Sequence, residues 1–275
     1  GVANTTLKRR FDIAEATPDT ALIERRPTGY QLTAAGHNVL TILEEMESVS
    51  LRLSSSFDGL QRGVQGTIRI AAPDVFGNKF LAPRLPMLAQ AHPGLEIELV
   101  STPRSTSLTK READLVVTGS QPQTGRLHTR KLTGYEIGLY ASRSYLDAAP
   151  PVSNRADLHH HPLVGYIDEL ILTPEMNSLR LLNPELKARI SCTNILYQMV
   201  VIKAGGGIGI LPCWLAEEEE SELVRILPGD VVFERTYWLN LTSDMRANPT
   251  IKAVRDFIVE QVSLSRRLFH PPNRK

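Results

Sequence analysis

Residues Ile23 to Gly36 read Ile-Glu-Arg-Arg-Pro-Thr-Gly-Tyr-Gln-Leu-Thr-Ala-Ala-Gly. Two short segments flank the turn sequence Pro-Thr-Gly, and the first of them carries the paired arginines Arg25 and Arg26. This pattern predicts a basic β-hairpin. Thr33 has the kind of side chain that caps the first turn of a helix, so we expect a long helix to begin there. The stretch therefore predicts a basic hairpin followed directly by a helix.

The residues upstream of the hairpin predict another helix, which presents short polar and cationic side chains at its N-terminal end. Asn can pair with adenine and Arg or Lys with guanine in the major groove. A helix of this kind followed by a basic hairpin is the layout of a winged helix-turn-helix on DNA, where the wing reaches phosphates or the minor groove. The candidate DNA contacts are Asn4, Thr5, Thr6, Lys8 and Arg9 on the helix, with Arg25, Arg26 and Tyr30 on the wing.

The chain starts at Gly1, so this recognition helix begins almost at once. A helix-turn-helix needs a preceding helix to brace it. We therefore expect one or two further helices to precede Gly1 in the natural protein, and residues 1–32 to form a partial DNA-binding domain.

The helix expected from Thr33 carries a heptad seam. Apolar residues recur at spacings of four and three, with one polar interruption at Ser50: Val39, Leu43, Met46, Leu53, Phe57 and Leu60. This seam favours a helix that pairs with a second copy of itself. The alternative is an amphipathic helix that faces the core of one domain. Because the helix lies between two regions of different composition, we interpret residues 33–62 as a dimerising linker.

The amino-acid composition limits the class of protein to which the chain can belong. The chain has 275 residues, 42% of them hydrophobic and 22% charged, as in soluble globular proteins. The net charge is only +1, so affinity for nucleic acid depends on local clusters of cations. The two cysteines, Cys192 and Cys213, are too few for a disulfide scaffold, which fits the cytoplasm. The most apolar stretch is interrupted by Lys203, glycines and Pro212, so we expect no membrane span.

After a glycine-containing hinge at residues 59–66, the pattern predicts an α/β domain. Strands are expected at 67–72, 95–100 and 114–118, separated by helical spacing through Phe80 to Leu88, broken by prolines, and by a short helix around Ser105 to Arg111. This βαβαβ order predicts a parallel sheet with right-handed crossovers.

The second half repeats this logic. Strands are expected at 162–166, 188–192 and 237–241, and a turn and strand at 205–212. Thr193 or Asn194 is expected to cap a helix that runs through Ala204, and another helix begins at Asn248. With crossover segments expected near residues 141–145 and 242–248, two similar subdomains form a clamshell, the architecture of periplasmic binding proteins.

Four segments together resemble the LysR-type transcriptional regulators, over nearly the whole chain from Val2 to about Val262. They are the hairpin and Leu-Thr-x-x-Gly run ending at Gly36, Gly-Thr-Ile-Arg-Ile from Gly66, Glu-Ala-Asp-Leu-Val-Val from Glu112, and Ala-Gly-Gly-Gly-Ile-Gly-Ile-Leu-Pro from Ala204. The recognition helix departs from the family pattern at Asn4 and Lys8, so the operator cannot be carried over.

The resemblance implies double-stranded DNA and a small-molecule effector as partners, a homo-oligomer that is a dimer of dimers, and an effector domain of two lobes. Lobe I would comprise residues 66–142 and 247–265, and lobe II residues 143–246. Closure of the lobes around the effector would change how the effector domains pack and thereby how DNA is bent.

In a clamshell, ligands lie where helix N-termini converge on the carboxyl ends of strands. Capping is the competing explanation for Asp74 and Thr193, although a cap can also contact an anion. Hydroxyl and amide donors outnumber acids here, so we expect a small polar effector, more often anionic than cationic. The candidate effector contacts are Asp74, Val75, Phe76, Ser101, Thr102, Thr118 and Gly119 from lobe I, and Tyr166, Thr193 and Asn194 from lobe II.

Other functions find less support. Three consecutive histidines, His159 to His161, cannot all face one metal ion, so no metal or other cofactor is expected. No nucleophile elbow, P-loop or dinucleotide fingerprint is present, which argues against an enzyme. Cys192 and Cys213 look like small core residues, although a redox switch as in peroxide-sensing relatives stays open. A clamshell solute-binding protein is the alternative, but it leaves the basic block and the heptad seam unexplained.

Overall fold

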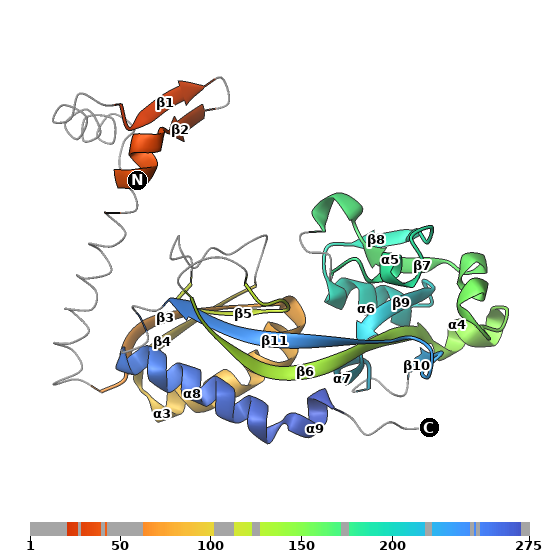
Figure 1. Cartoon of the computed structure of the whole chain (residues 1–275). Coiled ribbons are helices and arrows are strands. Elements are labelled where there is room, and N and C mark those ends of the chain that lie inside the picture. Colours follow the sequence, from red (N-terminus) through yellow and green to blue (C-terminus); the bar gives the residue numbers. More distant parts are fainter. Residues whose placement is uncertain are drawn as a thin grey trace. The chain divides into compact units, whose positions relative to one another are not determined.

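The structure is a computed structural model that divides into two compact units, Gly1–Gln61 and Arg62–Lys275. It describes residues 21–26, 29–39, 42, 63–101, 113–122, 127–171, 176–217, 222–242, 245 and 248–270 (Figure 1). The expected recognition helix, most of the heptad seam and the helix expected at 105–111 lie outside these residues. Within the described ranges, no helix has the length and apolar content to cross a bilayer.

The first unit contains the expected hairpin. Strands β1 (Ile23–Arg26) and β2 (Gly29–Leu32) are antiparallel, and Arg26 pairs with Gly29 across the turn. The Thr33 hydroxyl donates to the carbonyl of Ala21 (2.7 Å) and accepts from the N–H of Gly36 (3.0 Å), and residues 34–39 are helical. Thr33 therefore caps the helix, as predicted, and also ties it to the segment that precedes β1.

The surroundings of Gly36 explain why the N-terminal motif has a glycine at this position. A Cβ at this position would lie 2.0 Å from the carbonyl oxygen of Leu22, because the first turn of the helix lies against the backbone before β1. No side chain fits at that distance. The motif Leu-Thr-x-x-Gly therefore combines a helix cap with a close approach of two backbone segments.

In the second unit, the described residues form a nine-stranded mixed sheet in the order β4-β3-β5-β11-β6-β9-β7-β8, with β10 beside β6. Lobe I holds β3 (Gln65–Ala72), β4 (Gly94–Ser101) and β5 (Leu115–Thr118). Strand β3 lies between β4 and β5 and is parallel to both, so the predicted parallel βαβαβ order is confirmed for these three strands. The sheet positions the carboxyl ends of all three at one edge.

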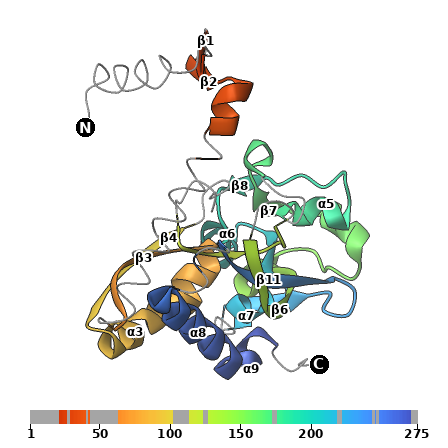
Figure 2. The same ribbon diagram turned by 60° about the vertical axis from the view of Figure 1, so that its left-hand side comes forward.

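One face of this sheet is covered by helices, and its core is shared with them. The chain after β3 is helical as η1 (Phe76–Leu81), η2 (Ala82–Arg84) and α3 (Leu85–Ala91), with the change of helix geometry at the expected prolines. Helix α8 (Pro249–Leu264) lies on the same side as α3 and leads to α9 (Arg266–Phe269) (Figures 1 and 2). Ile68, Ile70, Leu115 and Leu88 pack with Val254 and Ile258 in one buried cluster.

Two long strands connect the lobes. β6 (Leu127–Ser142) and β11 (Val232–Thr242) are antiparallel, and β11 pairs with β5 in lobe I, whereas the end of β6 pairs with β9 (Ile208–Pro212) and β10 (Leu223–Ile226) in lobe II. The chain therefore crosses between the lobes inside these strands, at about 133–136 and 234–237, and not near 141–145 and 242–248 as we expected. β6 was not predicted at all.

The third group of strands, β7 (Leu163–Tyr166), β8 (Ile190–Cys192) and β9, forms the parallel part of lobe II. Helix α6 (Ile195–Lys203) contacts all three strands, whereas η4 (Arg155–His160) and α5 (Ser178–Leu182) contribute Leu158 and Leu179 to a second core. Short elements complete the lobe: α4 (Arg143–Ala148), η5 (Asp168–Leu170) and α7 (Cys213–Ala216). Strands β7, β8 and β9 and helix α6 were predicted, but β10 and the short helices were not.

The glycine-rich motif has a steric explanation. Gly207 has a φ of 125°, and a Cβ there would lie 2.1 Å from the carbonyl oxygen of Pro162. This contact brings the start of β9 beside the start of β7, whose Leu163 pairs with Ile208. The motif therefore sets the register of the central strands of lobe II.

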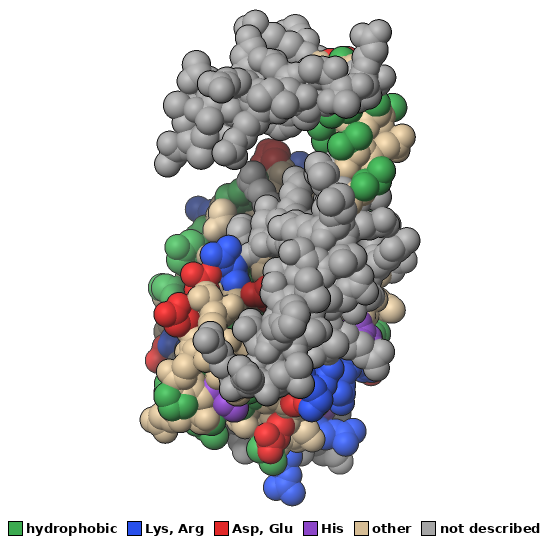
Figure 3. Space-filling model, turned by 90° about the vertical axis from the view of Figure 1, so that its left-hand side faces the viewer, with side chains coloured by type: hydrophobic (Ala, Val, Ile, Leu, Met, Phe, Trp, Pro, Cys, Tyr) green, Lys and Arg blue, Asp and Glu red, His purple; other side chains and the backbone are tan. Residues whose placement is uncertain are grey.

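Surface charges are interspersed on the face shown in Figure 3, where acidic and basic side chains lie beside one another. An example between β3 and β4 is the ion pair Arg69–Glu98 (2.6 Å), with both side chains about half exposed. Such pairs contribute little to stability. They indicate an ordinary solvated surface rather than a single-sign patch.

Candidate functional site

The carboxyl edge of lobe I brings together several of the predicted effector residues. Ala72 pairs with Ser101, and Ala71 pairs with Val116, so the residues that follow β3, β4 and β5 lie at one edge. Asp74 is half-buried there, and Ser101 and Gly119 are exposed. Thr102 lies outside the described residues. The sheet topology therefore places Asp74, Ser101, Thr118 and Gly119 as we expected.

Thr118 already uses its hydroxyl within the protein. It donates to the carbonyl of Ser120 (2.7 Å) and accepts from the side-chain amide of Asn240 (3.0 Å). Asn240 is fully buried on β11 and also donates to the carbonyl of Val116 (3.2 Å). This network locks the end of β5 against β11. The sequence offered no signal for Asn240 beyond a polar residue in an apolar strand.

Val75 and Phe76 are core residues. The Phe76 side chain is fully buried and its ring lies within 4.9 Å of Phe80 and 4.8 Å of Tyr237 between centroids. Phe269 and Trp214 complete the same aromatic cluster. Phe76 has no surface left for a ligand in this structure, so we do not carry it into the proposed site.

The carboxyl edge of lobe II holds the other predicted residues. Tyr166 pairs with Cys192 at the ends of β7 and β8, so Thr193 and Asn194 follow directly. Asn194 caps α6, because its side-chain oxygen accepts from the N–H of Tyr197 (2.9 Å). Thr193 is exposed and is not the cap. Of the two caps we left open, the structure selects Asn194, and the hydroxyl of Thr193 remains available at the surface.

Tyr166 links the two lobes electrostatically. Burial raises the pKa of its hydroxyl, and the nearby Tyr135 and the carboxylate of Asp74 raise it further. Asp74 comes from lobe I and Tyr166 from lobe II, so the structure brings together these two predicted residues. Tyr135 on β6 and Tyr237 on β11 stack at 4.2 Å, and burial raises the pKa of both. Neither was predicted as part of the site: Tyr135 lies on β6, which was not recognised as a strand, and Tyr237 was expected only as a residue of the strand at 237–241.

A pocket of about 170 Å³ lies beside Tyr166 in lobe II. It is bounded by the ends of β7 and β8, by α5 and by α6, and its lining includes Ser191 and Gln198. A larger groove of about 590 Å³ lies where α8 and α9 meet the middle of β6 and β11. None of the predicted effector residues lines that groove, whereas Tyr166 lines the smaller pocket.

The cysteines and histidines take structural positions. Cys213 is fully buried and Cys192 partly so, and burial raises the pKa of each thiol, which disfavours the reactive thiolate. His161 bonds through Nδ1 to the Tyr145 hydroxyl (2.7 Å), and His159 lies 3.1 Å from the amide of Asn183. Among the described residues, no group of three His, Cys, Asp or Glu side chains could hold a metal ion.

Of the predicted DNA contacts, the structure places the three on the hairpin by their strand positions. Arg25 pairs with Tyr30 and Arg26 with Gly29, so both arginines lie next to the turn. The five contacts expected on the recognition helix, Asn4, Thr5, Thr6, Lys8 and Arg9, fall outside the described residues.

Comparison with known proteins agrees with this geometry. The family model of the LysR substrate binding domain matches residues 61–263. The Mau operon transcriptional activator of Paracoccus denitrificans is 25% identical over 267 residues, which cover 94% of this chain and 87% of the relative. The iron-regulated virulence regulatory protein IrgB of Vibrio cholerae is 27% identical over 222 residues, which cover 79% of this chain and 74% of the relative.

The solved structure of CrgA, a LysR-type transcriptional regulator from Neisseria meningitidis, has the same fold with a TM-score of 0.66. The match has 18% sequence identity and covers 94% of this chain and 90% of CrgA. The second unit is thus a two-lobed α/β domain like that of periplasmic binding proteins, and the relatives are regulators, which decides against the solute-binding alternative. The chain belongs to the family of LysR-type transcriptional regulators.

Proposed function

We propose that this regulator reads DNA with a winged helix-turn-helix within residues 1–32 and responds to a small polar effector held between its two lobes. The observation that carries the DNA-binding part is the hairpin of β1 and β2, with two arginines beside its turn and a Thr33-capped helix directly behind it. A basic hairpin suits contact with phosphates or the minor groove.

Two kinds of DNA contact are proposed. On the recognition helix, Asn4, Thr5, Thr6, Lys8 and Arg9 read base edges, and Arg9 is the residue on which we rely most. On the wing, Arg25, Arg26 and Tyr30 contact the backbone and contribute affinity without sequence preference.

The oligomer is proposed from the seam of the helix that starts at Thr33. Residues 33–62 would pair two chains, and contacts between effector domains would join two such pairs into a tetramer. The partners are then double-stranded DNA, a second copy of the chain and an effector, and the protein works in the cytoplasm.

The effector is proposed to lie between lobe I and lobe II, which are joined through β6 and β11. Asp74, Ser101, Thr102, Thr118 and Gly119 would face it from lobe I, and Tyr166, Thr193 and Asn194 from lobe II. The shared ribbon of β6 and β11 supports this arrangement, because the middle of each strand pairs mainly with the other and lies between the strands of lobe I and those of lobe II. Rotation about this ribbon would close the lobes.

A gel-shift titration of the full chain on the DNA upstream of its own gene tests the proposal. Arg9→Ala should cost about 1–3 kcal/mol on specific DNA and relax the preference at one base pair. Arg26→Ala should weaken specific and non-specific binding alike and flatten the salt dependence. Arg189→Ala, a change of an exposed arginine in lobe II, is the matched control. Unchanged operator affinity in Arg9→Ala would refute the assignment of the recognition helix.

A further inference from the structure

The pocket of lobe II is formed where small residues line the sheet. Gly165 is the penultimate residue of β7, Ser191 lies opposite it on β8, and Ala188 precedes β8. A Cβ on Gly165 would lie 2.7 Å from Leu179 and 3.2 Å from Ala188, so the glycine allows the side chain of Leu179, another lining residue, to pack against the sheet. Leu186 and Ile210 form apolar walls. The result is a recess of about 170 Å³ that opens beside Tyr166.

Gln198 gives the pocket a specific chemical requirement. It lies on α6, is only 2% exposed and lines the pocket, and its side-chain nitrogen Nε2 has no hydrogen-bond partner in the described part of the chain. A buried amide N–H without an acceptor is unfavourable, and native proteins rarely leave one. If the Gln198 side chain turns its amide nitrogen toward the pocket, an occupant with an oxygen acceptor would satisfy it. Ser191 and Tyr166 add hydroxyl groups to the same lining.

The charges around the pocket favour an anion. Asp168 is paired with Arg180 (2.9 Å), which leaves Lys187 as the remaining charged residue among the described lining, with no ion pair to a described acid. On the other side of Tyr166, the carboxylate of Asp74 is close enough to raise the pKa of the tyrosine. An anion is therefore better accommodated in the pocket than at the edge of lobe I.

The volume of the pocket limits the size of the molecule that it can hold. An engineered apolar cavity of about 150 Å³ in another protein holds benzene, which has six non-hydrogen atoms. A space of about 170 Å³ thus suits a molecule of similar size with a polar end. Larger ligands would have to extend past Tyr166.

We propose that this pocket binds the carboxylate of a small monocarboxylic acid, or of the corresponding end of a larger effector, with the Gln198 amide turned toward the pocket as the donor and Ser191 beside it. This inference deepens the proposed function and rests on it, since it assigns the anionic end of the effector to the interior of lobe II.

The test is a ligand-detected NMR titration of the full chain with unbranched monocarboxylates from acetate to hexanoate and with the corresponding primary amides. Wild type should bind a member near the size of butyrate more tightly than its amide, with saturation at millimolar concentration. Gln198→Met keeps the volume but removes the donor, and should weaken binding of the best acid about tenfold. Ser191→Ala, a change at an exposed position, should weaken it about threefold.

Gln261→Met is the matched control, because Gln261 is also a buried glutamine on a helix but lies on α8, away from the pocket. It should leave the affinity unchanged. The proposal is overturned if no acid in the series binds below about 10 mM, if Gln198→Met and Ser191→Ala both bind like wild type, or if Thr193→Val alone loses the ligand. Loss of the ligand in Thr193→Val alone would place the ligand between the two lobes and not in the pocket. The gel shift on operator DNA reports separately on the proposed function, so the two can fail independently.

Discussion

The two lobes end in similar strand edges, but they treat their polar groups differently. At the edge of lobe I, the hydroxyl of Thr118 both donates and accepts, and Asn240 donates twice from a fully buried position. At the edge of lobe II, the amide nitrogen of Gln198 is buried without a partner, and Thr193 is exposed beside the helix it does not cap.

Residue size accounts for this difference. After β3, the aromatic residues Phe76 and Phe80 fill the space beneath the edge of lobe I. At the corresponding place in lobe II, the small residues Gly165 and Ala188 are part of the lining of a pocket. Two lobes with the same βαβ logic therefore differ at these edges. The amide nitrogen of Asn240 is bonded in lobe I although its side-chain oxygen lacks a partner, whereas in lobe II the amide nitrogen of Gln198 lacks one and a pocket lies beside it. The following predictions test whether this contrast holds.

The largest effect is expected from Phe76→Ala in lobe I. Removing this fully buried ring from its aromatic cluster should lower the free energy of unfolding by about 3–5 kcal/mol. Urea unfolding of the full chain measures it. Phe233→Ala on β11 removes a ring that is only partly buried and should cost clearly less. Equal losses in the two variants would mean that the edge of lobe I is not the tightly packed region we describe.

A matched pair of buried amides tests the contrast more directly. Asn240→Leu removes two donated hydrogen bonds and leaves the carbonyl of Val116 without that donor, so it should lower the free energy of unfolding by about 1–3 kcal/mol. Gln198→Met removes an amide that lacks a donor contact, and its stability should equal or exceed that of wild type. If Gln198→Met is destabilised as much as Asn240→Leu, the amide of Gln198 already has a partner within the protein. The main support for a ligand in the pocket would then be lost.

Local signals allowed much of this fold to be predicted from the sequence. Alternation and turn residues located β3, β4, β7 and β9, and Thr33 and Asn194 were recognised as candidate caps from their chemistry. β6 was missed because it carries Arg130, Lys131 and two glycines and pairs with β11, a strand about a hundred residues away. Such long-range pairing leaves no local pattern, and the position of the lobe crossover depends on it.

The candidate site was predictable to the level of strand ends, but not of individual side chains. Topology rules place Asp74, Ser101 and Thr118 at one edge, and the structure agrees. Whether a residue at such an edge points into the core or toward solvent depends on packing that the sequence does not encode locally, as Phe76 illustrates. Gln198 was missed because a single polar residue within an apolar helix has no distinguishing pattern.

The two residues before α6 should separate capping from ligand contact. Asn194→Ala removes the side-chain acceptor for the N–H of Tyr197 and should cost about 1 kcal/mol of stability. Thr193→Val changes an exposed residue that caps nothing and should leave the free energy of unfolding within about 0.5 kcal/mol of wild type. Chemical denaturation of both variants gives the comparison. A larger loss of stability in Thr193→Val than in Asn194→Ala would mean that Thr193, and not Asn194, caps α6.

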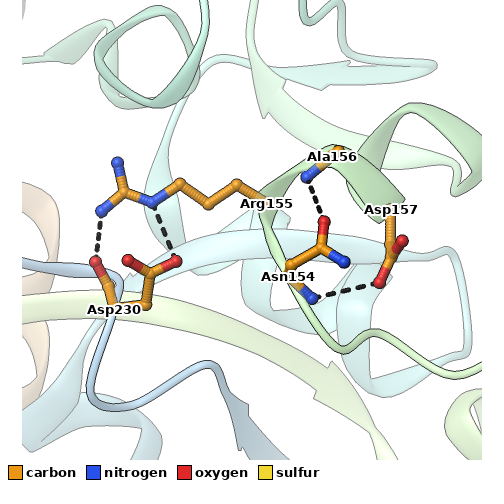
Figure 4. A network of polar contacts seen from close by, with 5 residues as sticks. All are labelled: Asn154, Arg155, Ala156, Asp157 and Asp230. Atoms are coloured by element: carbon orange, nitrogen blue, oxygen red, sulfur yellow. Dashed lines mark hydrogen bonds and ion pairs between the residues drawn. The ribbon is translucent and has the colours of Figure 1, made fainter.

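The smallest effects concern two carboxylates with lowered pKa values, one in each lobe. In lobe II, Asp157 accepts hydrogen bonds from the backbone N–H groups of Ser153 and Asn154, which lower its pKa. Figure 4 shows this cap of η4, with Asn154 accepting from Ala156, and Arg155 bound to Asp230. In lobe I, burial opposes the shift of Asp256, but hydrogen bonds and charges from Arg255 and Lys252 outweigh it and lower the pKa.

A carboxylate whose pKa is lower in the folded state contributes stability that is present above its unfolded pKa, about 3.9, and is lost as the pH falls through the folded value. Both residues should therefore contribute to acid unfolding, but only the ion pairs of Asp256 should be screened by salt, since the donors to Asp157 are uncharged backbone groups. Carboxyl-carbon NMR titrations at about 0.05 M and 1 M salt measure this, because the screening length falls to about 3 Å at the higher concentration. The pKa of Asp256 should rise toward its ordinary value at high salt, and that of Asp157 should stay low. If Asp157 responds to salt as strongly as Asp256, its shift comes from nearby charge rather than from the backbone cap, and the contrast between the lobes does not extend to their surface carboxylates.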